Sequence, residues 1–124
     1  MNNKTVYFAH ATNHPNFRSE LYAPLKKLTD IDLVLPHEKD LEVVSSKEKI
    51  RNSDLFICDI SFASLGSGIE IGWANSFTVP ILFIYKKGSK ISNSVEVVSD
   101  NFFKYDILEK DLSKLEKVIK RILN

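Results

Sequence analysis

The apolar run at residues 55–58, Leu-Phe-Ile-Cys, constrains the fold of this chain more than any other feature. It leads into a segment rich in serine and glycine, and then into an apolar stretch with helical spacing that carries Glu70. A continuous apolar run is typical of a strand that is covered on both faces of a sheet. The sequence therefore predicts a strand, a short Gly-Ser loop, and a helix with Glu70 in its first turn.

Strands and helices alternate along the whole chain. Apolar runs predict strands at residues 6–9, 31–35, 55–58, 79–85 and 102–105, and helical spacing predicts helices at residues 17–28, 45–50, 69–77 and 112–122. This alternation favours a parallel sheet with helices on both faces. We expect an α/β protein with a flavodoxin-like (Rossmann-like) three-layer sandwich and a five-stranded parallel sheet of order 2-1-3-4-5. Because no repeat or linker divides the 124 residues, residues 1–124 are expected to form a single domain.

Topology and loop chemistry point to the same crevice. Ligands of such sheets bind beyond the carboxyl ends of the strands at the switch point, here the first and third strands. The residues after these strands are 10–13 and 59–68. Gly66 and Gly68 have no Cβ that would keep a ligand from the backbone, and a helix start flanked by serines suits an anion. The sequence predicts a small-molecule site here that holds a phosphate.

Glu70 is the carboxylate best placed to face such a ligand. It could act as a nucleophile toward the anomeric carbon of a sugar, or it could simply complement the helix dipole. Asp59 could hydrogen-bond a base or assist protonation of a leaving group, or it could cap the Gly-Ser loop. His10 could bind phosphate or base at the mouth of the site, or be a solvated loop residue. Trp73 is expected to pack in the core or at a subunit interface.

Composition and charge exclude several classes of partner. With 17 basic and 16 acidic residues the net charge is +1, so nothing favours a nucleic acid. No apolar run is long enough to cross a bilayer, and no signal-peptide core follows the first four residues, so no membrane partner is expected. His14 and His37 show no metal-ligand spacing with each other or with Cys58, the single cysteine. We expect a cytoplasmic protein that uses neither a metal nor an organic cofactor.

Residues 59–61 (Asp-Ile-Ser), 64–74 (Ser-Leu-Gly-Ser-Gly-Ile-Glu-Ile-Gly-Trp-Ala) and 79–81 (Val-Pro-Ile) resemble the nucleoside 2-deoxyribosyltransferase family. The likeness is closest to its 2'-deoxynucleoside 5'-phosphate N-hydrolases, which share the pattern S-L-G-x-G-x-E-x-G and a similarly short chain. The resemblance implies an enzyme that is an N-glycosidase or a transferase. Its substrate would be a (deoxy)nucleoside or a nucleoside 5'-monophosphate, and cleavage would proceed through a covalent glycosyl-enzyme.

The resemblance also implies roles for individual residues. Glu70 is the nucleophile that attacks C1' and releases the base, and Tyr7 is an active-site tyrosine near the sugar and this glutamate. Ser64 and Ser94 match phosphate-binding serines, of which Ser94 reaches into the site of a neighbouring subunit. A homodimer or a larger homo-oligomer is therefore expected.

Two departures from the family pattern leave alternatives open. Ser46 stands where the family usually has an aspartate that helps to hold the ribose and the nucleophile. Ala11 and Asn13 replace the serine and arginine that follow the first strand in the hydrolases. A catalytically weak nucleotide-binding or sensing module on the same scaffold is thus the alternative to an enzyme. Within the enzyme class, hydrolysis and base transfer both stay open.

Overall fold

A computed structural model describes residues 3–38 and 43–124 of the chain. Its strands are β1 (Lys4–His10), β2 (Ile31–Val34), β3 (Leu55–Asp59), β4 (Ile81–Lys86) and β5 (Phe102–Tyr105). They form one five-stranded sheet of order β2-β1-β3-β4-β5, in which every neighbouring pair is parallel. The predicted α/β class and strand order are confirmed.

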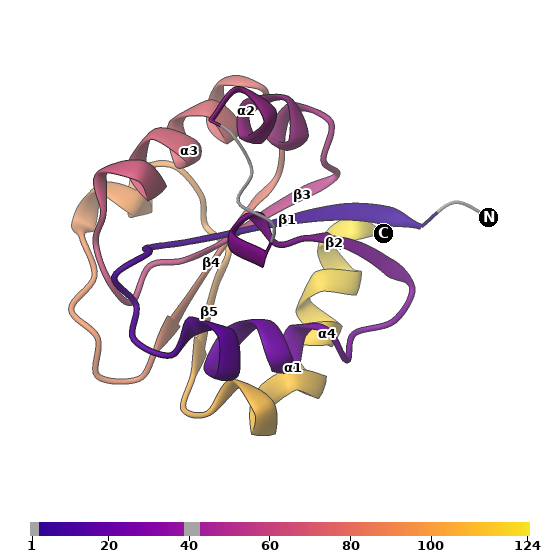
Figure 1. Ribbon diagram of the computed structural model, residues 1–124, viewed down its shortest axis with the longest axis vertical. Helices are drawn as coiled ribbons and strands as arrows, with labels where there is room; N and C mark the ends of the chain where they lie inside the picture. Colours follow the sequence, from indigo (N-terminus) through magenta and orange to yellow (C-terminus); the bar gives the residue numbers. More distant parts are fainter. Residues whose placement is uncertain (1–2, 39–42) are drawn as a thin grey trace.

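Helices cover both faces of the sheet. They are α1 (Ala23–Leu25), α2 (Val43–Arg51), α3 (Leu65–Ser76) and α4 (Leu108–Leu123), with shorter turns η1 (Arg18–Tyr22), η2 (Pro36–Glu38) and η3 (Asn93–Val97). Figure 1 shows α2 and α3 on one side of the sheet and α1 and α4 on the other, so the fold has three layers. In the two described stretches, no helix has both the length and the apolar character of a membrane span.

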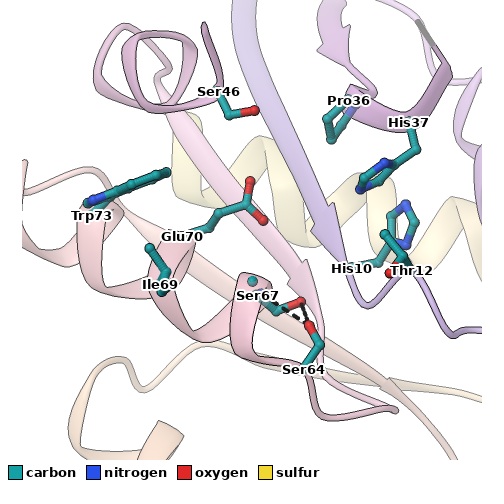
Figure 2. Close-up of a pocket in the computed structure, with 11 residues that line it drawn as sticks. His10, Thr12, Pro36, His37, Ser46, Ser64, Ser67, Ile69, Glu70 and Trp73 are labelled. Atoms are coloured by element: carbon teal, nitrogen blue, oxygen red, sulfur yellow. Dashed lines mark hydrogen bonds between the residues drawn. The ribbon is translucent and has the colours of Figure 1, made fainter. Parts of the chain in front are cut away.

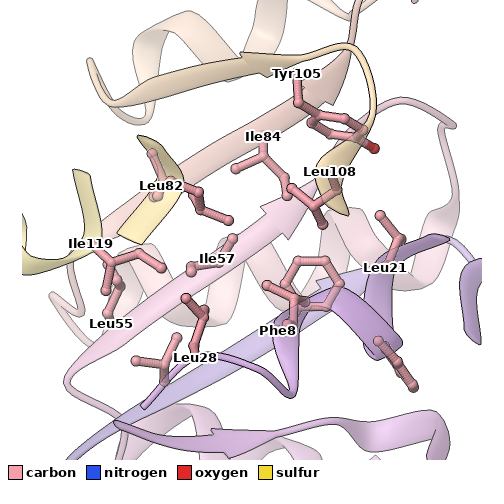
Figure 3. Close-up of a cluster of buried hydrophobic side chains, with 14 residues drawn as sticks. Phe8, Leu21, Leu28, Leu55, Ile57, Leu82, Ile84, Tyr105, Leu108 and Ile119 are labelled. Carbon is pink, nitrogen blue, oxygen red and sulfur yellow. The ribbon is translucent and has the colours of Figure 1, made fainter. Parts of the chain in front are cut away.

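The alternation of side chains along the central strands creates a core on each face. In β1, Val6 and Phe8 pack with residues of α1 and α4, whereas Tyr7 and Ala9 pack with residues of α2 and α3. Figure 3 shows the cluster on the α1–α4 side. Every residue of β3 is buried, as expected for the central strand of a parallel sheet. Among them, Cys58 has a raised pKa because its thiol is fully buried.

One predicted helix is divided and another begins early. The helical pattern over residues 17–28 contains Pro24, which was expected to kink or divide it, and the segment is divided into the π-helical turn η1 and the single turn α1. Helix α3 begins at Leu65 rather than at residue 69, because the Ser64 side chain caps it. Glu70 therefore lies in the second turn of α3 and not in the first, and the predicted Gly-Ser loop is shorter than expected.

Candidate active site

A pocket of about 290 Å³ opens beyond the carboxyl end of β1, between α2, α3 and η2. Its lining consists of His10, Thr12, Pro36, His37, Ser46, Ser64, Gly66, Ser67, Ile69, Glu70 and Trp73. This volume is near the lower end of the range for small-molecule sites, roughly 300–1,000 Å³. The crevice predicted from the strand order is therefore present, and it suits a small ligand.

Glu70 is directed into this pocket from α3 (Figure 2). Its Oε2 accepts a hydrogen bond of 2.7 Å from the hydroxyl of Tyr7, which is fully buried in β1. Burial raises the pKa of the Glu70 carboxyl, while the bond from Tyr7 lowers it. Burial and the charge of Glu70 raise the pKa of Tyr7 far above its usual value, so the phenol stays protonated and donates. The stabilising effect of a helix dipole is largest in the first turn, which makes the dipole explanation for Glu70 the weaker one.

Ser46 occupies the opposite wall of the pocket, on α2. Its residue is 8% exposed, and a hydrogen bond between its side chain and Tyr7 lowers the pKa of Tyr7. Ser46 therefore lines the same pocket as Glu70, the residue to which Tyr7 is hydrogen-bonded.

Ser64 lies at the rim of the pocket as the N-cap of α3. Its Oγ accepts a hydrogen bond of 3.1 Å from the backbone N–H of Ser67 and donates one of 2.8 Å to Ser67 Oγ. The neighbouring Gly66 faces open space, since a Cβ built there would meet no atom within 4 Å. The structure therefore places both predicted residues at the pocket, with the Ser64 hydroxyl occupied by helix capping.

A second cavity, of about 400 Å³, lies between α3 and η3. Gly68 and Ser94 line this cavity and not the pocket of Glu70, whereas Ser64 and Ser67 border both. The first turns of α3 thus form the wall between the two spaces. Within one chain, the structure does not bring Gly68 and Ser94 to Glu70.

His10 forms part of the pocket wall, but its two ring nitrogens are already used. Nδ1 donates to the carbonyl of Ala11 at 2.9 Å, and Nε2 lies 2.7 Å from the Tyr22 hydroxyl. Because a carbonyl can only accept, the neutral ring carries its hydrogen on Nδ1 and Nε2 accepts from Tyr22. Burial lowers the pKa of His10 to about 4. His10 is therefore a buried, neutral wall residue, and the expectation of a solvated loop histidine was wrong.

Several lining residues were not expected from the sequence. His37 lines the pocket from η2, with its ring centroid 5.1 Å from that of His10. Trp73 packs against the core on the α2–α3 face, as predicted, and it also lines the pocket beneath the Lys47 ammonium, which is 5.7 Å from the ring centroid. The spacing of residues 66, 69, 70 and 73 along one helix face would have predicted Ile69 and Trp73 beside Glu70. Thr12 and Ser67 belong to the segments 10–13 and 59–68 that were expected to form the crevice, whereas Pro36 carries no such signal.

Asp59 is oriented away from this pocket. It follows Leu55 and Ile57 at alternate positions of β3, and these pack on the α1–α4 face. Its Oδ2 accepts a bond of 2.5 Å from the Tyr105 hydroxyl, and its Oδ1 accepts one of 2.9 Å from the N–H of Ser61. The structure does not bring Asp59 to Glu70, and its contacts correspond to the alternative role of holding the loop after β3.

The described lining combines one carboxylate with several hydroxyl groups. Glu70 is the only acidic residue among the lining residues given above, and Thr12, Ser46, Ser64 and Ser67 supply hydroxyls. In the described parts of the chain, no three His, Cys, Asp or Glu side chains converge as metal ligands would. Hydroxyl groups can bind a sugar through hydrogen bonds. A desolvated carboxylate can stabilise the positive charge that develops on the anomeric carbon of that sugar.

No protein-family model matches the sequence, and no curated protein does. Solved structures match the fold. A CMP N-glycosidase from Clostridium botulinum, BcmB, has a TM-score of 0.66 at 22% identity, over 91% of this chain and 99% of that one. A conserved protein from Enterococcus faecalis V583 has a TM-score of 0.62 at 19% identity, over 96% and 99%. The lysine decarboxylase LdcF from Francisella novicida has a TM-score of 0.59 at 15% identity. The match covers 99% of this chain but only 18% of the decarboxylase chain. The chain therefore has a fold that it shares with an N-glycosidase and with part of a decarboxylase.

Proposed function

We propose that this protein cleaves the N-glycosidic bond of a nucleoside or a nucleoside 5'-monophosphate, with Glu70 as the nucleophile. The observation that carries the proposal is the half-buried Glu70 carboxylate, which lies at the wall of a small pocket and accepts a hydrogen bond from Tyr7. The fold similarity to a CMP N-glycosidase supports the same class of reaction. The residues that resemble the nucleoside 2-deoxyribosyltransferase family include both Glu70 and Tyr7.

The reaction consists of two displacements at C1' of the sugar. An oxygen of ionised Glu70 bonds to C1' while the bond from C1' to the base nitrogen breaks, and the base leaves with the electron pair and takes a proton from water. Water then attacks C1', the glycosyl ester of Glu70 breaks, and the carboxylate is restored as a proton passes to solvent. Two inversions retain the configuration of the sugar. A second base in place of water would give transfer instead of hydrolysis.

The environment of Glu70 suits this role. Burial removes water from the carboxylate and raises its pKa, which makes the ionised form a better nucleophile. The Tyr7 hydroxyl opposes that rise and holds one oxygen in place. A carboxylate fixed in this way also stabilises the positive charge that develops on the sugar in the transition state.

The test is to incubate the protein with a panel of nucleosides and their 5'-monophosphates and to measure free base by chromatography. We expect base release by the wild type and a loss of at least about a thousandfold in Glu70→Gln, which keeps the shape of the side chain but removes the nucleophile. Mass spectrometry should detect one sugar on the peptide that contains Glu70. Tight binding of a nucleotide, with no base released by either protein, would instead support the sensing module.

We also propose that two copies associate through α3. This helix buries only Ser67 and Ala74 among its described residues, while Leu65 is 83% exposed and Ile69 is 46% exposed. Val97 of η3 is 89% exposed, and its neighbours Val95 and Val98 line the second cavity. Exposed apolar residues on a helix suit an interaction surface, and a second copy would bring its own η3, with Ser94, close to α3.

The test of this association is the mass of the particle in solution. Light scattering should give a dimer for the wild type and a monomer for the double variant Leu65→Asp and Ile69→Asp, because two charges would have to be buried in the contact. Lys104→Asp is the control variant. Lys104 is exposed on strand β5 and not on α3, so this change should leave the dimer intact. A wild type that stays monomeric at high concentration would contradict the proposal.

A further inference from the structure

We infer that Tyr22 is a positioning residue whose hydroxyl fixes η2, and with it His37, as the wall of the pocket that faces Glu70. The inference rests on the proposed function, because it concerns how the same pocket receives its substrate. Tyr22 is not among the described lining residues, but its two hydrogen-bond partners, His10 and His37, are. Figure 2 shows Pro36, His37 and His10 across the pocket from Glu70.

The hydrogen bonds at the Tyr22 hydroxyl have a defined direction. Its oxygen lies 2.7 Å from His10 Nε2 and 3.2 Å from the backbone nitrogen of His37. A backbone N–H can only donate, so Tyr22 accepts from His37. The His10 ring carries its hydrogen on Nδ1, which donates to the Ala11 carbonyl at 2.9 Å, and its Nε2 therefore accepts from Tyr22. The bonds thus run from His37 through Tyr22 and His10 to Ala11.

Burial makes the Tyr22 hydroxyl difficult to replace by water. Tyr22 and His10 are each 3% exposed. Burial also raises the pKa of Tyr22 to about 12, so the phenol keeps its hydrogen at neutral pH. The ring of Tyr22 packs edge-on against three others, at centroid distances of 5.2, 5.3 and 6.3 Å, those of His10, Phe17 and Phe8. Removal of the hydroxyl would leave a buried acceptor on His10 and the N–H of His37 without this partner, which is unfavourable.

Two exposed interactions also link η2 to the segment that contains Tyr22. The Arg18 guanidinium donates to the His37 carbonyl at 3.3 Å, and the Lys26 ammonium pairs with the Glu38 carboxylate. Both Lys26 and Glu38 are more than a third exposed, and exposed pairs of this kind contribute little because water competes for the same groups. Of these three links to η2, the one from Tyr22 is therefore the strongest.

The position of η2 affects substrate binding more than the chemical step. Helix η2 is a single short turn, Pro36–Glu38, and its internal bond from the N–H of Glu38 to the Leu35 carbonyl does not fix it relative to α3. A wall that is already in place need not be ordered when the substrate binds, which improves affinity. Glu70 itself is held by Tyr7 from β1. Loss of the Tyr22 hydroxyl should therefore weaken binding and leave the nucleophile in place.

The first experiment uses NMR of the full-length protein at pH 7.5. The amide hydrogen of His37 should exchange slowly with solvent in the wild type and at least about tenfold faster in Tyr22→Phe. Tyr105→Phe is the matched control, because it removes another phenol hydroxyl from the same core cluster, one that bonds Asp59, and should leave this exchange unchanged. In the wild type, ¹⁵N shifts should show the hydrogen of His10 on Nδ1. Unprotected exchange at His37, or a hydrogen on Nε2 of His10, would overturn the inference without any variant.

The second experiment measures base release from the nucleoside 5'-monophosphate of the panel that is cleaved best. Tyr22→Phe should raise KM about tenfold and change kcat by less than about twofold, as expected when a binding contribution is lost. Arg18→Gln removes only the exposed bond to His37 and should change KM by less than about twofold. A loss confined to kcat, or equal effects of the two variants, would overturn the role of Tyr22. The exchange measurement needs no turnover. A protein that releases no base, but whose His37 exchange accelerates in Tyr22→Phe, would therefore refute the proposed function and support the anchoring of η2 by Tyr22.

Discussion

Tyr7 and Glu70, 63 positions apart in the sequence, are joined by a hydrogen bond of 2.7 Å between the phenol and Oε2. The bond connects the inner strand β1 to the helix that covers its α2–α3 face. Tyr7 is also stacked on Phe56 of β3, with ring centroids 5.8 Å apart. The orientation of the proposed nucleophile thus depends on the packing of the sheet, and not only on the local loop after β3.

The first prediction concerns Tyr7→Phe. Phenylalanine keeps the ring in the core but removes the donor to Glu70, so the Glu70 pKa should rise further and the carboxylate should be less well oriented. We expect kcat/KM for base release to fall by about 10- to 100-fold at pH 6 and by less at pH 8, given a lost bond to a charged group of roughly 1.5–3 kcal/mol. Tyr105→Phe is the matched control, because that phenol lies on the opposite face of the sheet. Equal losses in both variants would show that the effect is merely structural.

The second prediction concerns the stability of Glu70→Gln. Burial raises the folded-state pKa of Glu70 above its usual value. The contribution of Glu70 to the free energy of unfolding is therefore fully present at low pH, where the group is protonated, and is lost as the pH rises through the folded-state pKa. Glutamine carries no charge and avoids this loss. We expect urea midpoints to be higher for Glu70→Gln than for the wild type at pH 8, by an energy on the order of 1 kcal/mol, with the difference shrinking toward pH 4. A constant difference across this range would argue against a buried charge.

The third prediction concerns acid and His10. Its folded-state pKa is about 4, below the usual value of 6.5, so its contribution to stability is present above pH 6.5 and is lost as the pH falls toward 4. The loss amounts to at most about 3 kcal/mol. His10→Gln should be less stable at pH 7.5, because ring packing is lost, but its stability should change less between pH 6.5 and 4. Urea unfolding of both proteins across this range measures the difference, and parallel curves would contradict the prediction.

The fourth prediction concerns Asp59 and Tyr105. Burial raises the folded-state pKa of Asp59, so its ionisation costs stability as the pH rises above the usual aspartate range. Asp59→Asn should therefore be most destabilising, relative to the wild type, near pH 4 and less so at pH 8. It should release base at a rate within about threefold of the wild type, because the carboxylate faces away from the pocket. A loss of turnover in Asp59→Asn without a loss of stability would contradict this prediction and would support a catalytic role for Asp59.

Most of the fold could be predicted because a chain in which strands and helices alternate can form only a few sheet topologies. Strand runs that are apolar throughout require cover on both faces, and right-handed crossovers place successive helices accordingly. The start of α3 was missed because Gly66 and Gly68 are poor helix formers. The Ser64 cap and tertiary packing outweigh that propensity, and with the earlier start Glu70 moved from the first to the second turn.

The site was predicted in part, and the errors have physical reasons. Glu70 and Ser64 lie at the predicted pocket because strand ends and helix starts meet at one edge of the sheet. Tyr7, which was expected from the family resemblance, contacts Glu70 from the middle of β1. Asp59 was misplaced because its nearness in sequence to the loop said nothing of which sheet face it occupies. The partners of His10 lie 12 and 27 residues away, at Tyr22 and His37, and no local pattern indicates such contacts.

Helix α3, which carries the proposed nucleophile, has glycine at positions 66, 68 and 72, and a Cβ at any of them would meet no atom within 4 Å. Each glycine weakens a helix by about 1 kcal/mol relative to alanine. This helix is therefore maintained by its cap and its neighbours rather than by its own propensity. Its amide hydrogens should exchange with solvent through local opening at lower free energy than those of β3, although β3 is buried along its whole length and lies in contact with this helix.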